Sequence, residues 1–298
     1  MAGSSRDRSR EIRRLLEQAL PGHAVRSIVQ AGEGSDHVAF EVNGELIVRF
    51  AKDPDPAGPA RQVRAELRVL ATVTALSPPA VPEPLLGAED DGVLVYRKIP
   101  GTPLLDLRAD RPHLDLARFG QVIGEFLSRL HRAPVSALED FAPRERLTSA
   151  EWLASAHRDY ERVIAWVPAA LRAPIEAFLA ESPPDETQVT TLCHNDLGTE
   201  HILVDPATLV VTGIIDWADA AITDPACDLA LIYRDLGTDA LTSILDHYRG
   251  DAERVEGLRQ RARFYARCSV FGEMTYGLVA GHEAYLVQSL SALRRLFS

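Results

Sequence analysis

The sequence has 298 residues, of which 46% are hydrophobic and 25% charged. It is long for a single core and suits two packed lobes or domains of a globular enzyme. The formal net charge of -11 disfavours a general nucleic-acid binder, because duplex binding depends on basic side chains that neutralise phosphates. No run of about 18 apolar residues predicts a membrane span, and the opening MAGSSRDRSR lacks the apolar segment of a signal peptide.

The charge is unevenly distributed along the chain. Residues 101–298 carry 19 Arg, no Lys and 29 acidic residues, a net charge of -10, whereas residues 1–100 have a net charge of -1. An acidic second half would attract a cationic ligand, although a solvated acidic surface accounts for the same numbers. The three cysteines, Cys193, Cys227 and Cys268, are far apart and odd in number. This pattern favours reduced thiols in a cytoplasmic protein over a disulfide framework or a zinc knuckle.

The first hundred residues predict a small, mostly antiparallel sheet with a helix on it. Asn43-Gly44 joins two strand-like runs and is a strong signal for a two-residue hairpin. The predicted elements are a helix at 10–20 that ends at Pro21-Gly22, strands at 25–30, 37–42 and 45–50, a helix at 62–76, and a strand at 92–101.

The rest of the chain predicts mainly helices. LARFGQVIGEFLSRLHRA has the apolar stripe of an amphipathic helix, and Thr148 or Ser149 can cap the helix that begins near Glu151. The predicted elements are helices at 116–133, from about 151 to 180 and from Asp228 to the end, and β-type runs at 192–205 and 209–217.

The stretch LCHNDLGTEHILVD, residues 192–205, gathers many ligand-capable side chains. Three interpretations are open: a two-metal hydrolase, a structural metal site and the catalytic loop of a phosphotransferase. Asp216 ends the apolar run VVTGIID, and a carboxylate there is costly unless it is paired or binds a cation. It is therefore a candidate metal ligand, with His201 as a second. Cys193 lacks a partner cysteine at zinc spacing, whereas a two-metal phosphatase also gathers His and Asp.

A glycine-containing segment in the first half, AGEGSDHVAF, favours the phosphotransferase. Gly32, Gly34 and Ser35 form a loop whose backbone can approach phosphates closely, although alone such a pattern is more often a turn. Arg49 follows one strand later, and Glu66 in the next helix can pair with it. A phosphatase needs none of these residues.

These motifs together resemble the aminoglycoside phosphotransferase family, over about residues 25–290. CHNDLGTEHILVD is similar to the catalytic loop of that family, GIIDWADAAITDPACDLA to its metal-binding aspartate segment and VYRKIPG to its hinge. The order and spacing match the kinase plan. The HND…H form and GEGSDHVAF most resemble 2″-aminoglycoside phosphotransferases, and IIDWADAAITD and YRDLG are also similar to macrolide 2′-phosphotransferases.

The resemblance implies an α+β, bilobal protein-kinase-like fold and a role for each matching residue. The N-terminal lobe would span 1–94, the hinge 95–101 and the helical C-terminal lobe 102–298. Asp196 would accept the proton of the acceptor hydroxyl, and His201 and Asp216 would bind Mg²⁺. The implied nucleotide-binding residues are Gly32, Gly34 and Ser35 over the phosphates of ATP or GTP, Arg49 with its partner Glu66, and the backbone of Tyr96, Arg97 and Lys98 at the purine.

Two of these positions depart from the family. His201 stands where many relatives have Asn, and an imidazole nitrogen is a softer ligand than Mg²⁺ prefers. Arg49 stands where a lysine is usual, and its planar fork differs from a point charge. Lys52 is the alternative phosphate contact, but strand alternation puts it on the other face from Arg49, so we favour Arg49.

Acceptor binding is expected in the helical second half. Candidates to contact the ammonium groups of an acceptor are Asp228, Asp235, Glu273 and Glu283, with Tyr276 or Tyr233 as an apolar wall, although acidic residues on helices usually face water. Other polar residues have structural interpretations: His194 braces the loop, His131 binds carbonyl groups at a helix end, Trp217 packs in the core, and Asp224 or Asp228 caps a helix.

The expected protein is a Mg²⁺-dependent kinase that moves the γ-phosphate of ATP or GTP to a hydroxyl of an aminoglycoside-like antibiotic, without nucleic-acid or membrane partners. The alternatives are a kinase of a macrolide or a small metabolite on the same fold, and a nucleotide-binding module without catalysis. Arg49, Asp196 and Asp216 are expected to converge on one triphosphate–cation site.

Overall fold

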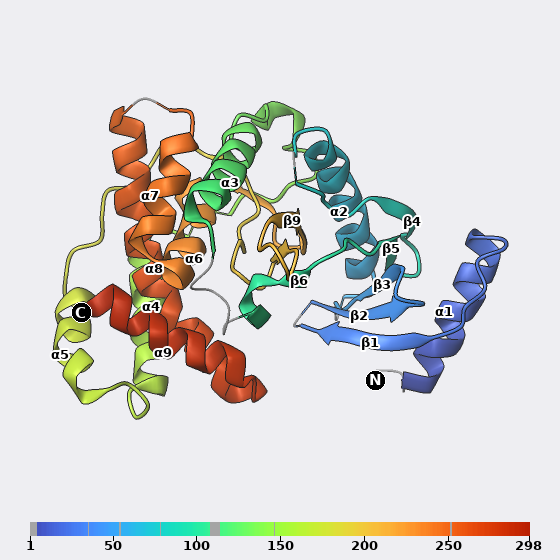
Figure 1. Ribbon diagram of the computed structural model, residues 1–298, viewed down its shortest axis with the longest axis horizontal. Coiled ribbons are helices and arrows are strands. Elements are labelled where there is room, and N and C mark those ends of the chain that lie inside the picture. The colour runs from blue at the N-terminus through green and yellow to red at the C-terminus, as the bar shows by residue number, and fades with distance from the viewer. Residues whose placement is uncertain are drawn as a thin grey trace. The chain divides into compact units, whose positions relative to one another are not determined.

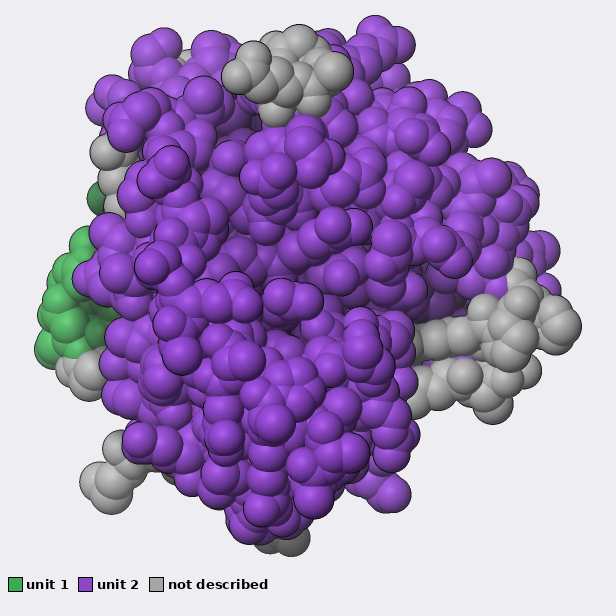
Figure 2. All heavy atoms as spheres, turned by 90° about the vertical axis from the view of Figure 1, so that its left-hand side faces the viewer, with its two compact units in different colours: residues 1–75, 80–99 green, residues 76–79, 100–298 purple. Residues whose placement is uncertain are grey.

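The computed structural model describes residues 5–34, 36–53, 55–77, 79–107, 114–145, 147–250 and 252–298, and Figure 1 shows the course of the chain. Two compact units make up the protein: residues 1–75 with 80–99, and residues 76–79 with 100–298. Figure 2 colours them green and purple. After Ile99, within the segment expected to be the hinge, the chain returns to the second unit and stays there to its end. Among the described residues, no helix is both long enough and apolar enough to span a membrane.

The first unit is a five-stranded antiparallel sheet with strand order β1-β2-β3-β5-β4 and two helices. This confirms the predicted antiparallel sheet, but the sequence did not reveal β4, which follows a proline-rich segment. Because β4 is an edge strand, it tolerates proline at its first position. The elements are α1 (Ser5–Ala19), β1 (Ile28–Glu33), β2 (His37–Val42), β3 (Leu46–Ala51), α2 (Gly58–Thr74), β4 (Pro84–Ala88) and β5 (Val93–Arg97).

The predicted hairpin between β2 and β3 is present. Asn43 and Gly44 have φ angles of 57° and 76°, as a type I′ turn requires. Apolar side chains of α1 pack with Phe40, Phe50 and other buried residues of the sheet. Arg49, between Val48 and Phe50 on β3, points to the opposite face and meets α2 there.

The second unit is mainly helical, with two small sheets. Of the two caps that the sequence offered, Thr148 and Ser149, it is Thr148 that caps α4, in a capping box with Glu151. The helices are α3 (Leu116–Leu130), the short η2 (Val135–Ala137), α4 (Ser149–Val163), α5 (Ala169–Leu179), α6 (Ala226–Leu236), α7 (Thr238–His247), α8 (Ala252–Ala280) and α9 (Glu283–Phe297). The strands are β6 (Thr102–Pro103), β7 (Thr191–Cys193), β8 (Ile202–Val204), β9 (Val211–Ile214) and β10 (Ala221–Thr223), arranged as β6-β8-β9 and β10-β7.

Candidate active site

The pairing of β8 with β9 brings two distant segments of the second unit together. These strands are antiparallel, and Ile202 is opposite Ile214. The residue before β8 therefore lies beside the residues that follow β9. The backbone N–H of Ile215 donates to the carbonyl of His201 at 3.0 Å. The loop between β7 and β8 thus meets Asp216.

Three of the predicted functional side chains meet at this junction. His201 Nδ1 lies 3.5 Å from Asp196 Oδ2, and its Nε2 lies 3.8 Å from Asp216 Oδ2. The Asp196 side chain is 41% exposed, whereas those of Asp216 and His201 are 23% and 16% exposed. An accessible carboxylate thus stands next to a more enclosed carboxylate–imidazole pair.

The hydrogen bonding of His201 leaves the ring suited to bind a cation. Its Nδ1–H donates to the backbone carbonyl of Asp196 at 2.7 Å, so in the neutral ring the lone pair is on Nε2, the atom nearer Asp216. Histidine ligands of metals typically donate their other ring N–H in this way. Burial alone would lower the pKa of His201. The carboxylates of Asp196, Glu200 and Asp216 have the larger, opposite effect, so the pKa lies above its ordinary value.

Glu200, in the same loop, is a further functional candidate. Ligand atoms of Asp196, Glu200 and His201 all lie within 4.8 Å of one another. Glu200 Oε2 is buried and has no hydrogen-bond partner among the described residues. Two carboxylates and an imidazole with an available nitrogen, joined by Asp216, are a donor set that fits a small divalent cation. The position of Glu200, directly before His201, was the only signal in the sequence.

Each of these two segments contains a residue with a positive φ angle. Asn195 and Asp216 have φ angles of 68° and 63°, a region that costs energy for residues other than glycine and is enriched at functional sites. The Asn195 side chain donates to Glu145 at 2.6 Å, which ties the loop to the segment before α4.

His194 braces the loop, as predicted. Its fully buried ring accepts from the backbone N–H of Asp196 at 3.3 Å and donates to the carbonyl of Ile215 at 2.9 Å. Burial lowers its pKa, which agrees with a neutral ring that has one donor and one acceptor nitrogen. Trp217, 1% exposed, packs against this ring with centroids 4.6 Å apart, as expected for a core residue.

Asp228 anchors the same loop from the first turn of α6. Its carboxylate accepts from the backbone N–H groups of His194 at 3.0 Å and Asn195 at 2.8 Å. It also bonds to His131 Nε2 at 3.1 Å, and the other nitrogen of that ring lies 3.0 Å from the Tyr248 hydroxyl. Asp228 is completely buried, so it is placed to hold the loop rather than to meet an acceptor. His131 likewise pairs with Asp228, whereas the sequence suggested helix-end carbonyls.

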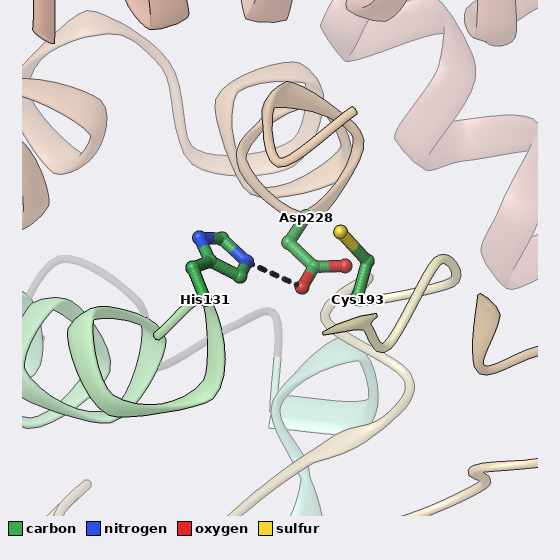
Figure 3. A group of neighbouring side chains, drawn as sticks. All are labelled: His131, Cys193 and Asp228. Atoms are coloured by element: carbon green, nitrogen blue, oxygen red, sulfur yellow. Dashed lines mark hydrogen bonds and ion pairs between the residues drawn. The ribbon is translucent and has the colours of Figure 1, made fainter. Parts of the chain in front are cut away.

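Figure 3 shows Cys193 beside the His131–Asp228 pair. Ligand atoms of these three buried residues lie within 4.8 Å of one another, but a metal needs a thiolate. Burial raises the pKa of Cys193 well above its ordinary value, and both Asp228 oxygens already accept hydrogen bonds. This group is therefore structural.

A buried charge cluster lies behind the loop, around Arg234. Asp235 accepts from Arg234 Nε at 2.8 Å and from the N–H and hydroxyl of Thr199 at 3.1 Å each. Arg234 Nη1 lies 2.6 Å from Glu273 Oε2, although without hydrogen-bond geometry, and Nη2 lies 3.9 Å from Glu200 Oε1. Three carboxyl groups therefore surround one guanidinium, and burial raises the pKa of two of them, Glu200 and Glu273.

The predicted acceptor residues occupy different environments. Asp235 and Glu273 are 2% and 9% exposed and pair with Arg234, whereas Tyr276 is 42% exposed. Burial raises the pKa of Glu273 well above its ordinary value, against the opposing effect of Arg234. Glu283, the first residue of α9, is exposed. Tyr276 and Glu283 are therefore open to solvent, whereas Asp235 and Glu273 are not.

In the first unit, Arg49 is paired as the sequence suggested. Its Nη1 donates to Glu66 Oε1 at 2.5 Å, and the side chains are 6% and 11% exposed. Lys52 makes different contacts from Arg49. Its ammonium donates to Glu33 at 2.5 Å and to the carbonyl of Gly34 at 3.1 Å.

The glycine segment is partly strand and partly turn. Gly32 lies in β1 at a register shift and pairs with Ala39, and the Gly34 N–H closes the turn onto the carbonyl of His37 at 3.0 Å. An added Cβ on Gly32 or Gly34 would meet nothing within 4 Å, so the backbone is open on that side within this unit. Ser35 lies outside the described residues.

The expected purine-binding segment is partly occupied by internal contacts. Tyr96 and Arg97 end β5, and Tyr96 is 7% exposed. The Lys98 N–H donates to the carbonyl of Glu45, and its ammonium pairs with Glu41 at 2.6 Å. Purine contacts at the Lys98 N–H would therefore compete with an existing hydrogen bond.

Comparison with known proteins points to one family. The profile of the phosphotransferase enzyme family matches residues 27–265. A viomycin phosphotransferase of Streptomyces vinaceus is 26% identical over 265 residues, covering 83% of this chain and 88% of that protein. A streptomycin 3″-kinase of Streptomyces griseus is 31% identical over 218 residues, covering 68% of this chain and 75% of that one.

Solved structures share the fold. The GDP and kanamycin complex of APH(2″)-IIIa has a TM-score of 0.74 at 23% identity, over 96% of this chain and 98% of that one. A macrolide 2′-phosphotransferase type I has a TM-score of 0.61 at 22% identity, over 98% of each chain. These likenesses confirm the predicted α+β, protein-kinase-like fold.

Proposed function

Because the chain belongs to the phosphotransferase enzyme family, we propose that it transfers the γ-phosphate of ATP or GTP to a hydroxyl group of an aminoglycoside-like antibiotic. The observation that carries this proposal is the junction at which His201 lies 3.5 Å from Asp196 and 3.8 Å from Asp216. Phosphoryl transfer needs an accessible carboxylate for the acceptor hydroxyl beside a site that holds a cation. A nucleoside triphosphate donor also implies a cytoplasmic enzyme.

Asp196 is the catalytic residue in this proposal. Its half-exposed carboxylate would orient the acceptor hydroxyl and accept its proton as the new P–O bond forms. The bond from the γ-phosphorus to the β–γ bridging oxygen breaks in the same transfer, and the nucleoside diphosphate leaves. His194 and Asp228 form hydrogen bonds that fix the backbone of the loop at Asp196. The carboxylate of Asp196 therefore needs little reorganisation before reaction.

His201 and Asp216 would hold Mg²⁺, with Glu200 as a further carboxylate in reach. The ion would neutralise charge on the phosphates. His201 would bind through Nε2, because Nδ1–H is already committed to the carbonyl of Asp196. Since a ligand histidine must be neutral, metal binding would release any proton that the neighbouring carboxylates stabilise on this ring.

The nucleotide would bind to groups of the first unit. Gly32, Gly34 and Ser35 would lie over the phosphates, where the open side of the two glycines supports a close approach. Arg49, fixed by Glu66, would contact the phosphates. Backbone groups of Tyr96, Arg97 and Lys98 are the proposed purine contacts.

The acceptor would bind in the second unit. Tyr276 is the proposed direct contact, because it is exposed and shares a face of α8 with Glu273 one turn earlier. Asp228, Asp235 and Glu273 would contribute from behind, by holding the loop and the buried cluster in place. The net charge of -10 over residues 101–298 favours a cationic acceptor.

An acceptor panel tests the proposal. The purified chain would be incubated with Mg²⁺, ATP or GTP and, in turn, kanamycin, streptomycin, viomycin, a macrolide and a simple amino sugar. We expect nucleotide-dependent addition of one phosphate to an aminoglycoside, measured by mass spectrometry, and none with Asp196→Asn. Preference for the macrolide or the amino sugar would mean that the acceptor belongs to that class and not to the aminoglycosides. Nucleotide binding without transfer to any acceptor, or phosphate release from monoesters without nucleotide, would refute the proposed reaction.

A further inference from the structure

His37 on β2 contacts Arg49, the proposed phosphate-binding residue of the first unit. Arg49 Nη2 lies 2.9 Å from His37 Nδ1. In the register of β2 and β3, Ala39 is opposite Arg49, so His37 is the diagonal neighbour of Arg49 on the same face of the sheet. Diagonal pairs are within reach of long side chains, and this one faces the helix that carries Glu66.

The protonation state of this contact follows from the chemistry of arginine. A guanidinium donates hydrogen bonds and accepts none, so His37 Nδ1 must be the acceptor and the ring must carry its proton on Nε2. The two ends of the guanidinium fork are therefore engaged by different partners, Nη1 by Glu66 and Nη2 by His37.

Two hydrogen-bond partners restrict the orientation of a guanidinium more than one partner does. A lysine ammonium is a compact charge that a single carboxylate can place, whereas a guanidinium is planar and useful to phosphates only in the correct plane. A contact at Nη1 fixes one point of the fork but not its plane, whereas contacts at both Nη1 and Nη2 restrict the plane as well.

The backbone of His37 also contacts the glycine-containing segment, at Gly34. Its backbone carbonyl accepts from the Gly34 N–H at 3.0 Å, while its side chain holds Arg49. One residue thus connects two groups that the proposed function assigns to the phosphates.

We propose that His37 is a positioning residue for nucleotide binding, which orients the Arg49 guanidinium and allows an arginine to work where a lysine is usual. This rests on the proposed function only in the assignment of nucleotide to the first unit. Binding of nucleotide can be measured without turnover, so failure of the two proposals is distinguishable.

A double-mutant cycle tests the orientation. The full chain would be prepared as wild type, His37→Leu, Arg49→Lys and the double variant, and the Kd for ATP and GTP measured by titration calorimetry. We expect His37→Leu to weaken binding about tenfold with Arg49 present, or about 1.4 kcal/mol. Because a lysine ammonium has no plane to orient, the same His37→Leu change in the Arg49→Lys protein should alter Kd less than about twofold.

His37→Asn provides a rescue, because the asparagine Oδ1 can accept near the position of Nδ1. Its Kd should be within about threefold of wild type. His23→Leu is the matched control: it removes a 3.3 Å ring contact to Asn43 in the same unit and should leave Kd unchanged. Equal losses from His37→Leu in both backgrounds, or an Asn variant as weak as the Leu variant, would overturn the proposal.

Discussion

The backbone N–H of Ile215 donates to the carbonyl oxygen of His201 at 3.0 Å. This bond joins the loop after β7 to the segment after β9, so Asp196, His201 and Asp216 are held as one piece. Because His194 adds a second link, from Asp196 to Ile215, the site is fixed by its backbone before any ligand arrives. Such preorganisation is what phosphoryl transfer requires of a protein.

Asp196→Ala should abolish phosphate transfer while nucleotide still binds. The side chain is the accessible carboxylate of the junction, and its loss removes the group that receives the acceptor proton. We expect kcat to fall by at least about a thousandfold, or about 4 kcal/mol of barrier, with Kd for nucleotide within about threefold of wild type. Single-turnover assays and calorimetry measure the two effects. Near-normal turnover would contradict the role of Asp196.

His201 should determine how much Mg²⁺ the reaction needs. His201→Leu removes the Nε2 ligand, and we expect the Mg²⁺ concentration for half-maximal rate to rise at least about tenfold. His201→Asn restores a neutral ligand and should recover most of the activity. Chelation of the metal should stop all three proteins. An unchanged Mg²⁺ dependence in the Leu variant would exclude His201 as a ligand.

Arg49 and Lys52 should differ strongly in nucleotide binding. Arg49→Met removes the paired, buried guanidinium, and we expect Kd for nucleotide to rise about a hundredfold, or about 2.7 kcal/mol. Lys52→Met removes a contact to Glu33 and the carbonyl of Gly34, which only braces the turn, so Kd should change less than about fivefold. Calorimetry with ATP distinguishes the two, and a larger effect at Lys52 would reverse the assignment.

Asp228 should matter for both stability and rate. Asp228→Ala leaves the backbone N–H groups of His194 and Asn195 and the ring of His131 without their acceptor, which should lower the free energy of unfolding by about 3 kcal/mol or more. Asp228→Asn keeps one acceptor oxygen, so its free energy of unfolding should fall by less. Because the loop carries Asp196, kcat should fall while acceptor KM stays near wild type. A selective rise in acceptor KM would instead restore the original expectation that Asp228 contacts the acceptor.

The sequence predicted the antiparallel sheet, the hairpin at Asn43-Gly44 and a helix cap at Thr148 or Ser149 because each depends on neighbouring residues. It also indicated Asp196, His201 and Asp216, since their spacing follows from a known chemical plan. Strand β4 escaped prediction because a short edge strand after several prolines carries little periodicity.

Contacts over long sequence separation were harder to predict. Asp228 and Asp235 look like ordinary acidic residues of a helix, yet they face inward, because α6 is buried along most of its length. The role of His37 depends on a strand register and a rotamer, neither of which composition reveals. Acidic residues were therefore assigned to the acceptor where the fold uses them as internal anchors.

Glu273 offers a test of stability against pH. Burial raises its pKa well above the ordinary value, so its favourable contribution to stability is complete below the unfolded pKa and is lost as pH rises through the folded pKa. Glu273→Gln mimics the protonated form and cannot titrate. We therefore expect the variant to match wild type in mildly acidic buffer and to exceed its thermal midpoint at alkaline pH, measured by calorimetry from pH 5 to about 9.

Asp235→Asn is the matched control from the same cluster. Asp235 accepts two hydrogen bonds from Thr199 and pairs with Arg234, so this change should lower the thermal midpoint at every pH. The Glu273→Gln variant should also keep acceptor KM within about twofold, because its side chain faces Arg234 and is 5% exposed. A thermal midpoint that falls in parallel with Asp235→Asn across the whole range would mean that Glu273 is ionised in the folded protein and stabilises it through Arg234.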